Sequence, residues 1–547
     1  MNKFIVRNFI LTFVLALLLS CNNTKHYKVW NNYNEAKELE ENKGHEIKRM
    51  QFKLIQSKFN DKNLWFENLN NQLSDFGDKE YEKLATIILD KDIPSIQKEI
   101  ISGKLTYEEL AKFYLFRIYK IEFNPDTFLN SIISINPNII QEAIKKDNKK
   151  PDSEYSMYGI PILLKDNINF EGIPTTAGAA VLKQNFTSDS YVAKKLKENG
   201  ALILGKTNLS EWAYYFCSGC PLGYSAIGGQ TLNPYGRKIF ESGGSSSGSG
   251  AAIAANLSSV SLGSETSGSI LSPSSLNSIV GLKPTIGLVS RSGIVPISNT
   301  LDTSGPMTKN VIDNAIVFNN IMGFDSDDSY SKEKINIDIS KVINSNLEGK
   351  RFGVFKSLLN DSLYRNAIVE IKNAGGIIIE FEPPKIDFQG FRKILDVEMK
   401  NEIPKYISNH TNLEIDIKNI ADIIKFNLED SIQRAPYGQR LFEGIVKDKT
   451  SKSEYIKLKN RIMSEGKRYF NESINKYSLD AILSINNFHA AYAAAAHYPC
   501  LTVPMGYRKS GIPSNLTFIG PSYSENNLYQ YGYSYERLTR KRIPPNL

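Results

Sequence analysis

Short apolar runs bounded by glycine and proline recur along the chain, with helical stretches such as residues 191–198 and 249–256 between them. Runs of three to five apolar residues are too short for buried helices and are typical of strands that are covered on both faces. Strands that alternate with helices predict an α/β fold with helices on both faces of the sheet. The runs span residues 160–164, 201–204, 260–262, 352–355, 377–379, 481–485 and 501–503.

The N-terminus has the pattern of an export signal. Lys3 and Arg7 precede an apolar run over residues 9–19, and Ser20 and Cys21 follow it. That run is too short to span a bilayer as a helix, which takes about 20 residues. A basic start, a short apolar core and a small residue are typical of a signal peptide. Because a cysteine follows the small residue, as in a bacterial lipobox, we expect removal of residues 1–20, lipidation of Cys21 and anchoring in the bacterial cell envelope. Ordinary secretion is the alternative.

Composition divides the rest of the chain. Residues 21–84 are rich in polar side chains and predict a polar tether with surface helices, followed by the main domain over residues 85–547. Thr106 and Glu109 have the spacing of a helix capping box. Residues 385–475 are helical in pattern, charged and poor in strands, which indicates an insertion over the sheet.

The charge pattern and the cysteines exclude several classes of function. The net charge of +8 is spread thinly, and its basic groups lack interleaved aromatic residues, so we expect no nucleic-acid partner. Cys217 and Cys220 form a single CxxC pair without two further ligands at a suitable spacing, so we expect no metal. In an oxidising compartment this pair can form a disulfide, which the sequence leaves open. We expect no cofactor.

Three motifs match known patterns only in their residue letters. Residues 200–207 fit a P-loop, but the apolar strand lies between the two glycines, where a loop is required to wrap phosphate. Residues 244–248 fit the G-x-S-x-G nucleophile elbow, but no convincing strand precedes them. A third motif, the S-x-x-K of residues 464–467, has none of its usual partner motifs.

Two loops of serine and glycine are better candidates for a site. The first lies in ESGGSSSGSGAA, residues 241–252, and the second in GSETSGSI, residues 263–270. A helix of small residues and a strand separate them, so we expect both loops at the same edge of the sheet. Lys165 follows the predicted strand of residues 160–164, and a buried lysine with a lowered pKa can serve as a base for serine.

These loops belong to a longer series of motifs that resembles the amidase signature family. GIPILLKDN, GALILGKTNLSEWA, GGQTLNPY, GGSSSGSGAA, GSETSGSILSPSSLNSIVGLKPTIGLVSRSGIVPIS and LDTSGPM occur in order, and YPCLTVPMGY and ERLTRKRIPP resemble the family's usual ending. The resemblance covers about residues 92–545 and is strongest to the peptide-amidase-like branch. It implies a single large domain with a central mixed β-sheet covered by helices on both faces.

The resemblance also implies a Ser–cis-Ser–Lys triad, position by position. Its lysine matches Lys165, the bridging serine in a cis peptide matches Ser245, and the nucleophile matches Ser269. Backbone N–H groups of Thr266, Ser267 and Gly268 would form the oxyanion hole. Glu265 and Leu271 stand where many members carry Asp and Arg, and Ser267 replaces a common Gly or Asp. These departures bear on the substrate pocket more than on the triad.

The expected activity is hydrolysis of linear carboxamides, including peptide C-terminal amides, to carboxylate and ammonia through an acyl-enzyme. Its partners would be a small-molecule or peptide amide and, through the lipid anchor, the membrane. Two alternatives are the amide-transfer subunit of a tRNA-dependent amidotransferase and a catalytically silent lipoprotein of the same fold. The export signal argues against the first, and the intact lysine and serines argue against the second. The sequence indicates neither the exact amide nor the oligomeric state.

Overall fold

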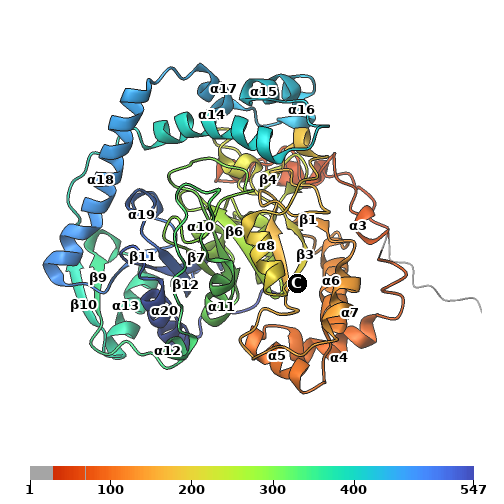
Figure 1. Cartoon of the computed structure of the whole chain (residues 1–547), viewed down its shortest axis with the longest axis horizontal. Helices are drawn as coiled ribbons and strands as arrows, with labels where there is room; N and C mark the ends of the chain where they lie inside the picture. The colour runs from red at the N-terminus through yellow and green to blue at the C-terminus, as the bar shows by residue number, and fades with distance from the viewer. Residues whose placement is uncertain (1–28, 68) are drawn as a thin grey trace, which may run out of the picture.

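The computed structural model describes residues 29–67 and 69–547, and their strands form one large sheet and one small one (Figure 1). The large sheet contains β1 (Ile132–Ile135), β2 (Pro161–Lys165), β3 (Leu202–Thr207), β6 (Val260–Glu265), β7 (Val280–Lys283), β8 (Thr303–Thr308), β9 (Arg351–Phe355), β10 (Ile377–Phe381), β11 (Ala481–Ile485), β12 (Cys500–Tyr507) and β13 (Pro513–Ile519). The small sheet pairs β4 (Tyr224–Ser225) with β5 (Gly229–Gln230).

The large sheet is mixed, and its strands lie in the order β1-β3-β2-β6-β8-β7-β12-β13-β11-β9-β10. β2 runs parallel to both β3 and β6, so the carboxyl ends of these three strands lie at one edge of the sheet. β8 runs antiparallel to β6, with Thr308 opposite Val260 and Thr303 opposite Glu265. The residues that follow β8 therefore lie at the opposite edge.

The α-helices lie in two groups along the chain. The N-terminal part contains α2 (Ala36–Asn42), α3 (Leu64–Glu67), α4 (Asp78–Ile88), α5 (Ile93–Ile101), α6 (Tyr107–Glu122), α7 (Ile139–Lys146), α8 (Tyr191–Glu198), α9 (Ser247–Ala254), α10 (Leu271–Leu276) and α11 (Val311–Ile321). The C-terminal part contains α12 (Ile339–Ile343), α13 (Ser362–Asn373), α14 (Phe391–His410), α15 (Ile420–Leu428), α16 (Ser431–Arg434), α17 (Arg440–Lys447), α18 (Lys452–Tyr477), α19 (Ala490–Ala496) and α20 (Glu525–Thr539).

Helices cover both faces of the sheet, as the sequence predicts. On one face, α9 packs on β2, β3, β6 and β8, and α10 packs beside it on β7, β12 and β13. On the other face, α11 packs on β6, β7 and β8, with α8 and α20 as its neighbours. The prediction of a single large α/β domain with a mixed sheet is confirmed.

The strand and helix predictions hold where the local signal is strong. All seven apolar runs coincide with strands, although β2 and β3 each begin one residue later than predicted. α8 spans the predicted residues 191–198, and the Ser190 hydroxyl accepts from the N–H of Ala193. The Thr106 and Glu109 capping box is present at the start of α6. One detail is wrong, because Ile377 in β10 is exposed rather than buried. β10 is the last strand of the sheet and lacks a neighbour on one side.

The segment predicted as an insertion contains no strand in the described structure and folds into α14 to α18. In Figure 1 these helices form an arch over one end of the sheet. Their apolar faces pack on one another and on the loop that follows β3, around Trp212, Phe216 and Phe442.

The prediction of a polar tether over residues 21–84 is wrong for its described part. Trp30, Phe52 and Ile55 are buried in the main core, and the Ile55 carbonyl accepts hydrogen bonds from the N–H of Gln230 and from Asn130. Apolar side chains that are buried without regular structure show no helical or strand periodicity, so the sequence pattern does not reveal them.

The predicted signal segment 1–20 and Cys21 lie outside the described residues. Among residues 29–67 and 69–547, no helix combines the length and the apolar character needed to cross a membrane.

Candidate active site

The two serine–glycine loops meet at the sheet edge formed by the carboxyl ends of β2 and β6. The N–H of Ser246 in the first loop donates to the carbonyl of Ser269 in the second at 3.1 Å. Gly248, at the start of α9, lets the first loop pack closely on the segments of Ser131 and Asn208, since a Cβ there would lie 2.4 Å from the Ser131 carbonyl oxygen. The prediction that both loops lie together is confirmed.

Lys165 is the last residue of β2 and is completely buried. Its Nζ lies 2.7 Å from the Ser245 Oγ, 2.9 Å from the Ser264 Oγ and 3.2 Å from the Ser264 carbonyl oxygen. Burial lowers the pKa of Lys165 to about 7, although Asp302 and Glu265 act in the opposite direction. A substantial fraction of this amine is therefore neutral at neutral pH.

Ser245 and Ser269 differ in exposure. The Ser245 side chain is completely buried, and the peptide bond between Gly244 and Ser245 is cis, as the resemblance implies. Ser269 is partly exposed at the turn between β6 and α10, so an outside molecule can reach it. Ser246, the serine of the apparent elbow, is completely buried and its Oγ contacts the backbone of Ser264. The nearest strand before it in the described structure, β5, already ends at Gln230, so no strand leads directly into this turn.

The turn that carries Ser269 is held by a buried carboxylate. Glu265 accepts hydrogen bonds from the N–H groups of Gly268, Ile270 and Leu271 at 2.7, 2.7 and 3.0 Å. This corrects one part of the expected oxyanion hole, because the Gly268 N–H is already engaged. Among the described residues, the N–H groups of Thr266 and Ser267 have no hydrogen-bond acceptor.

Ser264 and Asn167 are members of the site that motif reading did not single out. The Asn167 Nδ2 donates to the Ser264 Oγ at 2.9 Å, while the Asn167 Oδ1 is buried without a partner in the described part of the chain. Both residues lie inside motifs that carry the family resemblance, GIPILLKDN and GSETSGSI, so the sequence alone could have marked them as candidates. Their contact with each other and with Lys165 depends on the fold and could not be read from spacing.

A cavity of about 520 Å³ adjoins this region, and both polar and apolar atoms line it. Its walls come from the strand ends, the loop of residues 291–299 and one face of α14. Thr266 lines it, and the Thr266 hydroxyl donates to Asp302 at 2.5 Å. Arg291 and Asp328 form an ion pair in its wall. The insertion therefore supplies part of the cavity next to the turn that carries Ser269.

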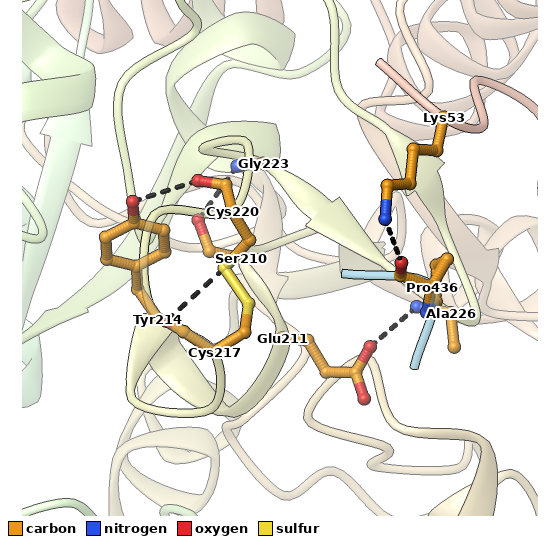
Figure 2. Close-up of a disulfide and its surroundings, with 9 residues drawn as sticks. All are labelled: Lys53, Ser210, Glu211, Tyr214, Cys217, Cys220, Gly223, Ala226 and Pro436. Carbon is orange, nitrogen blue, oxygen red and sulfur yellow. Dashed lines mark hydrogen bonds between the residues drawn. A yellow bond between two sulfur atoms is a disulfide. The ribbon is translucent and has the colours of Figure 1, made fainter. Parts of the chain in front are cut away.

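Cys217 and Cys220 form a disulfide in the loop that follows β3 (Figure 2). The Tyr214 hydroxyl donates to the Cys220 carbonyl at 2.9 Å, and the Gly223 N–H donates to the Ser210 Oγ at 2.8 Å. The N–H of Ser210 in turn donates to the Ser245 carbonyl at 3.0 Å. The loop that follows β3, which carries the disulfide, thus contacts the backbone of Ser245 through Ser210.

The structure explains why neither the P-loop-like stretch nor a histidine belongs to the site. β3 occupies the middle of the P-loop-like stretch, and its Lys206 is buried against Asp166 and the Ile168 carbonyl. His489 is buried beside Ser484, and burial lowers its pKa to about 4. In the part of the chain that the structure describes, no histidine hydrogen-bonds to Ser245 or Ser269, and no cluster of three or more His, Cys, Asp or Glu residues could hold a metal.

The comparisons with known proteins agree with this fold. The Amidase family matches residues 110–492. A probable amidase of Arabidopsis thaliana is 35% identical over 84% of this chain and 92% of its own length. One of the subunits of the glutamyl-tRNA(Gln) amidotransferase of Microcystis aeruginosa is 30% identical over 83% of this chain and 99% of its own.

Solved structures give the same result. An amidase family protein from Bacillus anthracis has a TM-score of 0.85 at 36% identity and covers 90% of this chain and 100% of its own. The native peptide amidase from Stenotrophomonas maltophilia has a TM-score of 0.77 at 34% identity over 84% of this chain and 99% of its own. The chain belongs to the amidase signature family and is an amidase, a hydrolase of the carbon–nitrogen bonds of linear amides.

Proposed function

We propose that Lys165, Ser245 and Ser269 form the catalytic triad of this amidase. The observation that carries the proposal is the 2.7 Å contact between the Lys165 Nζ and the Ser245 Oγ, two side chains that are completely buried. A neutral amine has two hydrogens and one lone pair. The two Ser264 oxygens can accept the hydrogens, which leaves the lone pair for the Ser245 hydroxyl proton.

The proposed reaction then moves one proton in each direction. Ser269 attacks the amide carbonyl while its proton passes to Ser245 and the Ser245 proton passes to Lys165. The same relay returns a proton to the leaving amine, and water hydrolyses the acyl-enzyme. The oxyanion is stabilised by the N–H groups of Thr266 and Ser267, each of which is worth about 3 kcal/mol in such a role.

The proposed substrates are peptide C-terminal amides. Two observations support this class: the similarity to a peptide amidase and the cavity of about 520 Å³ beside the Ser269 turn. A peptide has backbone donors and acceptors, and the cavity is lined by Asn167 and Ser292, whose Oδ1 and Oγ atoms have no partner among the described residues. Glutamine is the competing substrate, since one of the subunits of an amidotransferase is also similar to this chain.

The proposed location is the bacterial cell envelope, with acyl chains on Cys21. The support is the order of basic start, apolar run, Ser20 and Cys21 in the sequence. Intact mass of the membrane fraction tests it. A mature chain without lipid mass, or a Cys21→Ala variant that stays in the membrane, would contradict it.

The triad is tested by labelling with a fluorophosphonate probe and by ammonia release from a panel of peptide amides and glutamine. We expect the label on Ser269 and its loss in Ser269→Ala. Ser246→Ala is the matched control, because Ser246 lies in the neighbouring loop but is buried, and this variant should keep its label. Labelling of Ser246 with Ser269 untouched would overturn the assignment.

A further inference from the structure

A second cavity, of about 330 Å³, lies at the opposite edge of the sheet from the proposed triad. Lys309 directly follows β8, whose Thr308 pairs with Val260 at the start of β6, whereas Ser264 and Glu265 end β6 at the triad. Six residues of strand separate these two ends by about 17 Å. The cavity is lined by Asp90, Lys309, Asn310, Val503, Pro504, Tyr533, Glu536, Arg537, Arg540, Lys541 and Arg542.

Two buried cationic atoms at this cavity lack hydrogen-bond partners. Lys309 is only 4% exposed, and its Nζ has no partner among the described residues. The Nε of Arg542 is also buried and unpaired there. Leaving such a donor unpaired costs about 1–3 kcal/mol, and more when the group is charged. Native proteins keep few such groups, and each calls for an explanation such as a missing ligand.

The charges around the cavity are unbalanced toward the positive. Lys541 pairs with Glu370 and Arg542 pairs with Asp90, but Arg537 and Arg540 form no ion pair with any described residue. These last two side chains belong to exposed residues at the cavity rim.

The acidic groups near the cavity do not compensate for this excess. Burial raises the pKa of Glu536 to about 8, so this carboxyl group is mostly neutral at pH 7, and it accepts the N–H of Val311. Asp313 lies near Lys309 but accepts the N–H of Ile93, and burial raises its pKa to about 7. Lys309, Arg537 and Arg540 therefore remain without a full counter-charge.

We propose that this cavity binds a phosphate group, which goes beyond the amidase activity. A phosphate oxygen can accept from the buried Lys309 ammonium while others accept from the guanidinium groups at the rim, a combination that suits phosphate better than a single carboxylate. Val503, Pro504 and Tyr533 give the cavity an apolar wall for the organic part of a phosphate ester. That ester is either a soluble molecule or the headgroup of an anionic lipid.

Phosphate binding is tested by calorimetric titration of the full chain with inorganic phosphate, with chloride at equal ionic strength as the reference. We expect saturable binding of phosphate that weakens at least tenfold in Lys309→Met and in Arg540→Gln. Arg540 is exposed, so its variant should fold even if Lys309→Met does not. Lys452→Gln is the matched control, since Lys452 is an exposed cation at the start of α18, outside the cavity, and should leave binding unchanged.

The source of the phosphate is tested by sedimentation of the Cys21→Ser chain with vesicles. Retention on phosphatidylglycerol vesicles above that on phosphatidylcholine vesicles, lost in Arg540→Gln, assigns the site to a lipid headgroup. Phosphate binding with equal retention on both vesicles assigns it to a soluble ester. Absence of saturable phosphate binding, or binding that neither Arg540→Gln nor a folded Lys309→Met weakens, overturns the proposal. Amide hydrolysis should be unchanged in Arg540→Gln.

Discussion

The serine–glycine region of residues 242–283 and the helical insertion of residues 391–477 are built by opposite means. In the first, small side chains let backbone segments touch, and nearly every residue is buried. In the second, helices bury one apolar face and leave large side chains such as Leu428 and Ile432 exposed. In the first region, close packing therefore tolerates only small side chains. In the second region, each helix needs only apolar residues along its buried face.

This contrast predicts where change is tolerated. Both serines of the proposed triad and its backbone donors lie in the first region, and Lys165 contacts that region from the end of β2. The insertion forms only a wall of the neighbouring cavity. Chemistry should depend on the first region, and choice of substrate on the second.

The largest expected effect is the loss of the proposed base. Lys165→Ala should lower kcat by at least about three orders of magnitude, because removing one member of a catalytic unit removes most of its contribution. Lys165→Arg should be equally inactive, since a guanidinium stays protonated. Steady-state ammonia release measures both variants. His489→Ala is the control and should change kcat little, because His489 contacts Ser484 and not the triad.

The pH profile should follow the same amine. With the pKa of Lys165 at about 7, the neutral form predominates above pH 7 and falls tenfold per pH unit well below it. We therefore expect kcat/KM to rise about a hundredfold from pH 5 to pH 7.5 and then to level off. A profile that falls over this range, in a chain that stays folded, would contradict a neutral lysine as the base.

A pair of glycine substitutions tests the contrast in packing directly. Gly248→Ala places a Cβ 2.4–2.5 Å from backbone atoms of Ser131 and Asn208, so it should destabilise the fold by about 1–3 kcal/mol or more. Gly444→Ala, in α17, meets nothing within 4 Å and should stabilise the helix by about 0.5–1 kcal/mol. Urea unfolding measures both. Equal effects in the same direction would remove the distinction between the regions.

The loop that follows β3 contacts both regions and carries the Cys217–Cys220 disulfide. Removing this disulfide should have a moderate effect. For a bridge that closes four residues, the chain-entropy relation gives a stabilisation of about 2 kcal/mol. Cys217→Ser should therefore lower the free energy of unfolding by about that amount. It should also lower kcat, through the Ser210 contact with the Ser245 carbonyl. Cys500→Ser is the comparison, since Cys500 is a free buried thiol. Unchanged kcat in Cys217→Ser would show that the loop does not position Ser245.

The sequence predicts those strands whose residues form a distinctive local pattern. Strands with continuous apolar runs, such as β2 and β11, were predictable because both faces are buried. β7 and β8 were not, since VGLK and TSGPMT carry glycine, proline, lysine or threonine. Their polar groups are satisfied by long-range partners, as when Ser304 donates to the Gly263 carbonyl.

The site shows the same limit. Sequence motifs point to Lys165, Ser245 and Ser269 as one group, because each stands in a distinctive pattern of neighbours. The engagement of the Gly268 N–H by Glu265 depends on the rotamer of one carboxylate in a folded turn. No pattern of residue types specifies that geometry.

The packed N-terminal segment limits how far an anchored enzyme could move from its membrane. Trp30 is already fixed against Phe128, with ring centroids 5.4 Å apart, and Val29 is the first described residue. With acyl chains on Cys21, as proposed, the eight residues to Val29 would reach at most about 28 Å. This reach is close to the radius of gyration of about 24 Å expected for a globule of this length, so the tether would be no longer than about the size of the enzyme itself. The enzyme would thus sample only a thin layer of solvent beside the bilayer, and it would meet amides that diffuse along that surface.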